Sequence, residues 1–132
     1  MRGLVTAILV LAIAVFLGAC SGSSIPSSSL TIRDATTNAL LAASNAQGTL
    51  TLNVGDTRQI KVEHTYTNDA RNTETNEVTQ FVIWKWDMGS GATVDALGNI
   101  SGIAPGTSVL RAKYDPEWLG SSDNVRLTII VN

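Results

Sequence analysis

The sequence contains few of the residues from which enzyme sites and metal sites are usually built. Its 132 residues include one cysteine and one histidine, so no internal disulfide can form, and one histidine cannot seed the ligand set of a zinc site. That histidine, His64, alternates with Ile60 and Val62, which indicates a structural place on a strand face. No serine lies in the Gly-x-Ser-x-Gly order of a nucleophile elbow. We therefore predict that the protein is not an enzyme and has no resident cofactor.

Positive charge is also scarce. The chain has 9 Lys and Arg against 11 Asp and Glu, a net charge of −2. Nucleic-acid-binding domains carry a basic patch or stripe, and no such cluster is visible along the sequence. We therefore expect no nucleic-acid partner, and repulsion between like charges argues against acidic lipids or phosphate polymers as ligands.

The one long apolar run lies at the amino terminus. A positive charge at Arg2 precedes an apolar run over residues 4–16, and small residues follow. This layout predicts a secretory signal peptide over residues 1–19. Two alternatives remain open. One is a retained membrane helix, for which the roughly 17 uncharged positions before Cys20 are marginal, because a span needs about 20 apolar residues. The other is a plain secreted protein with a free thiol.

The segment Leu17-Gly18-Ala19-Cys20 resembles the lipobox of bacterial lipoproteins. The resemblance implies that the thiol of Cys20 receives a diacylglycerol and that the peptide is cleaved before Cys20. It also implies that the new amino terminus carries a further fatty acid such as palmitate. The implied location is the bacterial cell envelope, with the membrane as a partner through the lipid anchor. Ser21 in place of an aspartate after the cysteine implies the outer membrane, if the bacterium has two membranes.

The composition changes again after the cysteine. Serine, glycine and proline dominate residues 20–29, and such a segment cannot bury enough apolar surface to fold. We therefore predict a lipidated cysteine followed by a flexible tether over residues 20–29, and a folded domain over residues 30–132. Removal of residues 1–19 leaves 113 residues, which suits one domain with its tether.

Short runs with a period of two dominate the rest of the chain. Apolar and polar residues alternate over 50–54, 60–66, 110–114 and 125–131, which is the pattern of strands with one buried face. About seven such strands, separated by regular turns, predict an all-β sandwich or barrel.

Three segments depart from this alternation. Residues 78–86 form the most apolar and aromatic run after the signal peptide, so we predict a central strand covered on both faces near Phe81, Ile83 and Trp84. Residues 34–48 contain helix formers between a capping residue and a glycine, which predicts a loop or one or two helical turns. Residues 68–77 are polar without any period, which predicts an exposed loop.

An ordered set of short motifs is similar to the group 2 bacterial immunoglobulin-like domains of invasin- and intimin-like surface proteins. The matching pieces are Leu52-Asn53-Val54-Gly55-Asp56-Thr57, the strand of Trp84, Ala92-Thr93-Val94-Asp95, Gly98-Asn99-Ile100-Ser101-Gly102-Ile103 and Pro105-Gly106-Thr107. The resemblance covers about 80 residues, from Leu52 to Val131. It implies an immunoglobulin-like two-sheet β-sandwich with Trp84 in its core. It also implies a non-catalytic module for adhesion, protein binding or complex assembly, with a protein partner in the envelope or at the cell surface.

Two further tryptophans indicate where a partner would bind. If exposed, Trp86 and Trp118 would form an aromatic face for a sugar or a protein, because aromatic side chains dominate interface energetics. The alternative is that both pack in or over the core. A carbohydrate-binding module and a structural spacer are therefore the rival functions.

Acidic residues in two loops raise the question of a calcium site. The carboxylates concerned are Asp115, Glu117 and Asp123 in one loop, with Asp87 and Asp95 flanking another. Calcium binds six to eight oxygens from loops of this kind. Because the Asp-x-Asp-x-Asp-Gly order is missing from the sequence, we expect solvated acidic loops rather than a calcium site.

Overall fold

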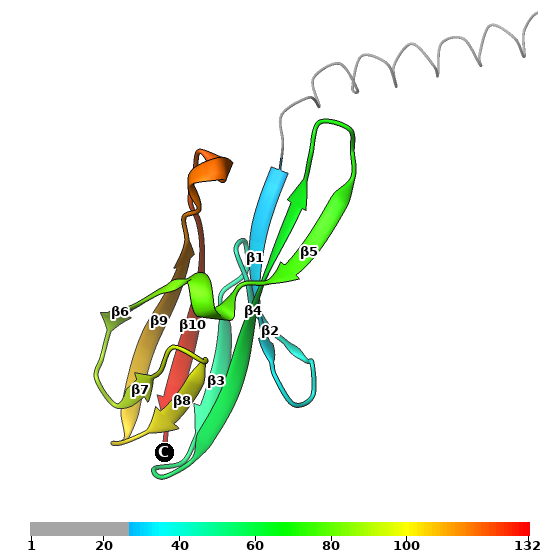
Figure 1. The fold of residues 1–132 in the computed structure, drawn as a ribbon. Coiled ribbons are helices and arrows are strands. Elements are labelled where there is room, and N and C mark those ends of the chain that lie inside the picture. The colour runs from blue at the N-terminus through cyan, green and yellow to red at the C-terminus, as the bar shows by residue number, and fades with distance from the viewer. Residues whose placement is uncertain (1–26) are drawn as a thin grey trace, which may run out of the picture.

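Residues 27–132 form two β-sheets that pack face to face (Figure 1). The computed structural model describes these residues, which contain no α-helix and no helix long and apolar enough to cross a membrane. The strands are β1 (Ser27–Asp34), β2 (Leu40–Ala43), β3 (Gly48–Leu52), β4 (Thr57–Thr67), β5 (Thr73–Glu77), β6 (Ile83–Met88), β7 (Ala92–Val94), β8 (Asn99–Gly102), β9 (Gly106–Tyr114) and β10 (Asp123–Val131). Two short 3-10 turns, η1 (Thr79–Phe81) and η2 (Glu117–Leu119), complete the fold. The predicted all-β sandwich is confirmed, with ten strands in residues 27–132 instead of about seven.

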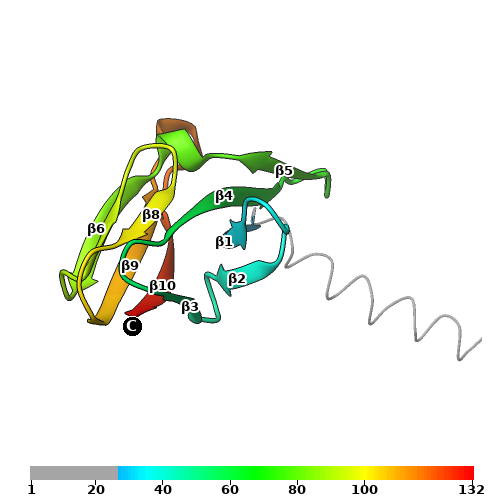
Figure 2. The same ribbon diagram turned by 90° about the horizontal axis from the view of Figure 1, so that it is seen from below.

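The first sheet is organised around the long strand β4. One edge of β4 pairs with the whole length of β1, from Ser27 opposite Thr67 to Asp34 opposite Ile60. The other edge is divided between β8, which pairs with residues 57–59, and β5, which pairs with residues 63–67. With β2 beside β1 and β7 beside β8, the order is β2-β1-β4-β8-β7; Figure 2 shows β2, β1, β4 and β8 side by side in this order.

The second sheet has the order β3-β10-β9-β6. Strand β10 lies in its middle, antiparallel to β9 and parallel to β3. Strand β6 pairs only with β9 and therefore forms one edge.

Inward side chains from both sheets make one core. The largest fully buried apolar side chains are Leu30, Ile32, Ile60, Val62, Ile100, Leu110, Val125, Leu127 and Ile129. They alternate with outward residues along β1, β4, β8, β9 and β10, because successive side chains of a strand point to opposite faces. The period of two in the sequence therefore identified most of the core.

The start of the domain differs from the predicted boundary. The composition predicts that Ser27, Ser28 and Ser29 belong to the tether, but they form the first part of β1. Their backbones pair with Thr67, Tyr66 and Thr65 of β4. Pairing with a distant strand satisfies backbone groups whatever the side chains are, so the serine-rich composition did not reveal it.

The segment over 34–48 contains no helix and places a short strand between two turns. Leu40–Ala43 forms β2, which pairs with β1 and buries Ala42. The tight turn before it places Asn38 at a φ of 62°, a left-handed conformation that asparagine tolerates better than most residues. The helix formers of this segment were overridden by pairing with β1.

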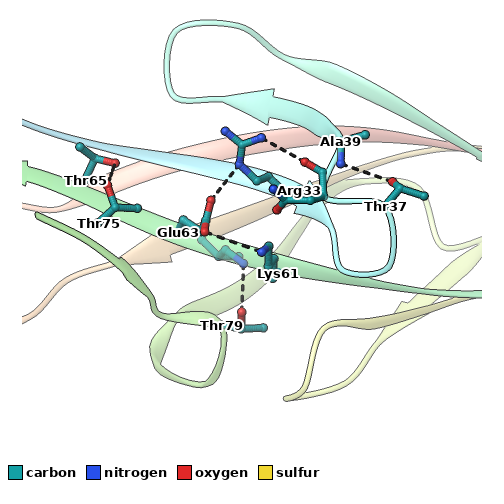
Figure 3. Close-up of polar contacts among 10 residues, drawn as sticks. Arg33, Thr37, Ala39, Lys61, Glu63, Thr65, Thr75 and Thr79 are labelled. Carbon is teal, nitrogen blue, oxygen red and sulfur yellow. Dashed lines mark hydrogen bonds and ion pairs between the residues drawn. The ribbon is translucent and has the colours of Figure 1, made fainter.

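The polar segment over 68–77 also contains a strand. Residues 73–77 form β5, which makes a hairpin with β4. All of its side chains are exposed, which explains the missing period. A cross-strand hydroxyl pair links Thr65 to Thr75 at 3.0 Å (Figure 3), and a second links Thr67 to Thr73 at 2.9 Å. Such pairs stabilise a sheet.

The prediction of a doubly covered central strand over 78–86 is wrong. The segment begins with η1, and its strand β6 is an edge strand. Phe81 is 71% exposed and Ile83 is 59% exposed. Only alternate residues of β6, Trp84 and Trp86, pack against the core. Because the outward residues Phe81 and Ile83 are also apolar, the sequence shows the continuous apolar run that is typical of a strand buried on both faces.

A buried carboxylate fixes the turn that follows β1. The side chain of Asp34 accepts hydrogen bonds from the backbone N–H groups of Thr36 and Thr37 at 2.8 and 2.9 Å, and it forms an ion pair with Arg58. The N–H of Thr37 and the Arg58 guanidinium lower the pKa of the Asp34 carboxyl to about 2, against the opposing effect of burial. A carboxyl whose pKa is lowered by folding stabilises the fold above its unfolded pKa of 3.8.

We predict that this contribution is lost as the pH falls through about 2. Asp34→Asn keeps an oxygen acceptor but carries no charge. Between pH 5 and pH 2 the free energy of unfolding should therefore fall more in the wild type than in Asp34→Asn, and the difference between the two decreases should be about 2 kcal/mol. Arg58→Gln, which leaves the two amide donors in place, should give an intermediate slope. Denaturant unfolding at several pH values measures the difference, and parallel pH profiles for wild type and Asp34→Asn would contradict it.

Candidate functional site

Three features of the chain meet at one end of the sandwich (Figure 1). They are the first residue of β1, the tip of the β4–β5 hairpin and the loop that contains η2. Residues 1–26 lie outside the described part of the chain, and with them the predicted signal peptide, Cys20 and most of the predicted tether. The described domain nevertheless fixes the point, Ser27, at which that preceding segment joins it.

Four aromatic rings gather at this end. Tyr66 and Trp118 meet edge to face, with centroids 5.2 Å apart at an interplanar angle of 86°. His64 lies 4.8 Å from the ring of Tyr114 and 6.0 Å from that of Trp118. Edge-to-face geometry matches the positive edge of one ring to the negative face of another. The cluster joins β4 of the first sheet to β9 and η2 on the side of the second sheet.

His64 is the buried member of this cluster and links it to the second sheet. Its side chain is buried, and its Nε2 lies 3.1 Å from Oδ2 of Asp123 at the start of β10. The pair connects the two sheets, because His64 belongs to β4 and Asp123 to β10. The structural role expected for His64 fits this position.

Trp118 is the exposed member of the cluster, at 62% of its surface. Its ring is held from one side by Tyr66 and His64, so a large aromatic surface faces solvent in a fixed orientation. Fixed aromatic surface suits binding because little conformational entropy is lost on contact. Trp118 therefore has the exposure that the sequence-based hypothesis required.

The other two tryptophans lie elsewhere. Trp84 and Trp86 are alternate residues of β6, half-buried against the core. Trp84 packs against the core from an edge strand rather than within the buried cluster, and its Nε1 is buried without a hydrogen-bond partner in residues 27–132. Trp86 does not join Trp118 in one aromatic face, since it points inward beside Trp84.

The carboxylates considered for calcium are engaged separately. Asp87 pairs with Arg111 and Arg126, whereas Asp95 accepts hydrogen bonds within its own turn, from Leu97 and Asn99. Between β9 and β10, Asp123 pairs with His64, and Asp115 lies 3.7 Å from Lys113. No group of three or more acidic, histidine or cysteine side chains in residues 27–132 is placed to hold a metal ion.

The sequence did not reveal that His64, Tyr66 and Tyr114 support Trp118. His64 and Tyr66 share a face of β4 by their spacing of two, which was visible, but the approach of Trp118 depends on pairing across the whole fold. Comparison with known protein families and with curated protein sequences finds no match to this chain.

Proposed function

We propose that the protein is a lipid-anchored component of a bacterial envelope, in which a non-catalytic, immunoglobulin-like β-sandwich binds a protein partner close to the membrane. The lipobox-like segment ending at Cys20 supports the anchor. The observation that carries the binding role is the exposed, supported ring of Trp118 at the end of the domain where the chain enters from Cys20.

The distance between anchor and aromatic cluster limits where the partner lies. Seven residue steps separate Cys20 from Ser27, and a fully extended chain of that length spans at most about 25 Å. The end of the domain that carries Trp118 is therefore held near the bilayer surface. A partner that contacts Trp118 would be embedded in, or attached to, the same membrane.

A protein partner suits this cluster better than a sugar. Tryptophan and tyrosine side chains are enriched among the residues that contribute most to protein interfaces. A carbohydrate-binding role at Trp118 would require free access for a glycan at the membrane-facing end of the domain. The role of a spacer alone would leave the exposed indole unexplained.

The proposal predicts that Trp118→Ala weakens partner binding. Loss of a central aromatic contact typically costs 2 kcal/mol or more, which is about a 30-fold weaker interaction. Crosslinking in intact cells should therefore yield much less of the crosslinked complex with Trp118→Ala than with the wild type.

Phe81→Ala provides the matched control. Phe81 is an aromatic residue of similar exposure, 71% against 62% for Trp118, but it belongs to η1. Crosslinking should persist in this variant. Equal crosslinking in all three proteins, or an equal loss in both variants, would contradict a partner site at Trp118.

A further inference from the structure

Half of the basic side chains in residues 27–132 lie on the outward face of the second sheet. They are Lys85 on β6, Arg111 and Lys113 on β9, and Arg126 on β10. Lys85 stands directly opposite Arg111, and Arg111 stands directly opposite Arg126. Three cations therefore form one row across three neighbouring strands, about 10 Å long at the usual strand spacing. The expectation from the sequence that no basic patch is present is wrong.

This row has too little negative charge to balance it. Asp87 is the only acidic residue at the outward positions of β6, β9 and β10, and it bridges Arg111 at 2.8 Å and Arg126 at 3.0 Å. Lys85 has no ion pair in the described part of the chain. Lys113 lies 3.7 Å from Asp115, just beyond the end of β9. The four cations with Asp87 and Asp115 therefore leave the face at +2, whereas residues 27–132 as a whole carry 8 basic and 11 acidic side chains. Like charges directly opposite each other destabilise a sheet, so stability alone does not account for the row.

The first sheet shows how the same domain neutralises cations elsewhere. On its outward face, the carboxylate of Glu63 lies between Arg33, at 2.8 Å, and Lys61, at 3.8 Å (Figure 3). Glu77 of β5 stands directly opposite Glu63 on the same face, so two carboxylates balance the two cations there. The excess on the second sheet is therefore local to that sheet.

Two hollows flank Arg111. One, of about 370 Å³, lies between Arg111 and the turn that joins β2 to β3; it is lined by Ala43, Ser44, Asn45, Ala46, Gln47, Arg111, Asn124, Val125 and Arg126. The other, of about 360 Å³, is lined by Ile83, Lys85, Arg111 and Lys113. Both volumes are at the lower end of the range for small-ligand sites. Arg111 belongs to both hollows, so one extended ligand lying across β6, β9 and β10 would occupy both.

We propose that this face binds an acidic polysaccharide, with its carboxylates on the row formed by Lys85, Arg111 and Arg126. Arginine pairs with carboxylates through two parallel hydrogen bonds. The hydroxyl of Ser44 and the amides of Asn45 and Asn124 in the larger hollow provide donors and acceptors for sugar hydroxyls.

A protein partner fits this face less well, because Ile83 is the only exposed large apolar side chain lining the hollows. Interface cores depend on such anchors. The inference is independent of the lipid anchor and of the aromatic cluster at Trp118.

The test compares two double variants of the full chain with equal net charge. Lys85→Gln with Arg126→Gln removes two cations from the row, whereas Arg33→Gln with Lys61→Gln removes two from the other sheet. Binding to sodium polygalacturonate is measured by affinity electrophoresis, with neutral dextran as the uncharged glycan. We expect the wild type to bind polygalacturonate and not dextran. The first double variant should bind at least about tenfold more weakly, since two charge contacts are lost, and the second should stay within about twofold of the wild type.

Three outcomes would overturn the proposal. The first is that the wild type does not bind polygalacturonate. The second is that both double variants lose binding equally, since attraction would then depend on net charge rather than on the row. The third is that a single-stranded oligodeoxynucleotide binds as tightly as polygalacturonate, because hydroxyl contacts in the hollows would then contribute nothing. Thermal unfolding of each variant verifies that the fold is retained.

Discussion

Replacing Cys20 with serine is expected to move the protein almost completely from the membrane fraction to the soluble fraction. Each buried methylene of an acyl chain contributes about 0.8 kcal/mol to membrane binding, and one chain gives only marginal attachment, whereas two or three chains hold a protein firmly. Serine offers no thiol for the diacylglycerol, so all chains are lost together. Fractionation of cells that produce the wild type or Cys20→Ser, followed by immunoblotting, measures the effect.

Mass spectrometry of the purified native protein provides the control. The wild type should begin at Cys20 and carry the added mass of acyl chains, and Ser21→Ala should leave both the mass addition and the membrane fraction unchanged. An amino terminus at Met1, or an unmodified thiol on Cys20, would contradict the anchor. Membrane association that survives Cys20→Ser would instead favour the retained helix that the sequence left open.

Gly98→Ala is expected to be among the most destabilising single substitutions in the domain. Gly98 has a φ of 84°, and a Cβ built on it would lie 2.3 Å from the backbone oxygen of Ile60. The left-handed conformation costs a residue with a Cβ about 1–2 kcal/mol, and forced overpacking adds about 1–3 kcal/mol. The sum is a large part of the roughly 5–15 kcal/mol that stabilises a domain of this size.

Gly55→Ala separates the two contributions. Gly55 has nearly the same φ, 92°, but a Cβ added to it would have no other atom within 4 Å. Only the conformational cost of about 1–2 kcal/mol should remain. Denaturant unfolding of both variants gives the comparison. Equal losses of stability would mean that Ile60 moves aside without cost and that the close approach is unimportant.

The alternation of apolar residues was sufficient to predict the fold class. It located the buried faces of β4, β9 and β10, where Val62, Leu110 and Leu127 are enclosed. The turn at Gly98 was equally visible, because its positive φ requires glycine and the residue stands between two short strands. These features are determined by residues that are close together in the sequence, so a sequence pattern can predict them.

What the sequence hid depends on pairing between distant segments. Ser27–Ser29 became a strand because β4 lies beside them, and Thr73–Glu77 became one without burying a single side chain. The row of Lys85, Arg111 and Arg126 is spread over 42 positions of the sequence and exists only through the registers of β6, β9 and β10. The negative net charge of the chain gave no indication of this local row of cations.

The place of β1 in its sheet determines how the domain responds to mechanical force. Any pull transmitted through the residues before Ser27 enters β1, which is hydrogen-bonded to β4 along its length and to β2 on its other side. The hydrogen bonds of an antiparallel pair lie perpendicular to the strands, so tension along β1 loads them in shear, all at once. A strand at the edge of a sheet, pulled sideways, would instead peel away one bond at a time. Entry through an interior strand therefore favours a domain that stays folded when its point of attachment is under tension.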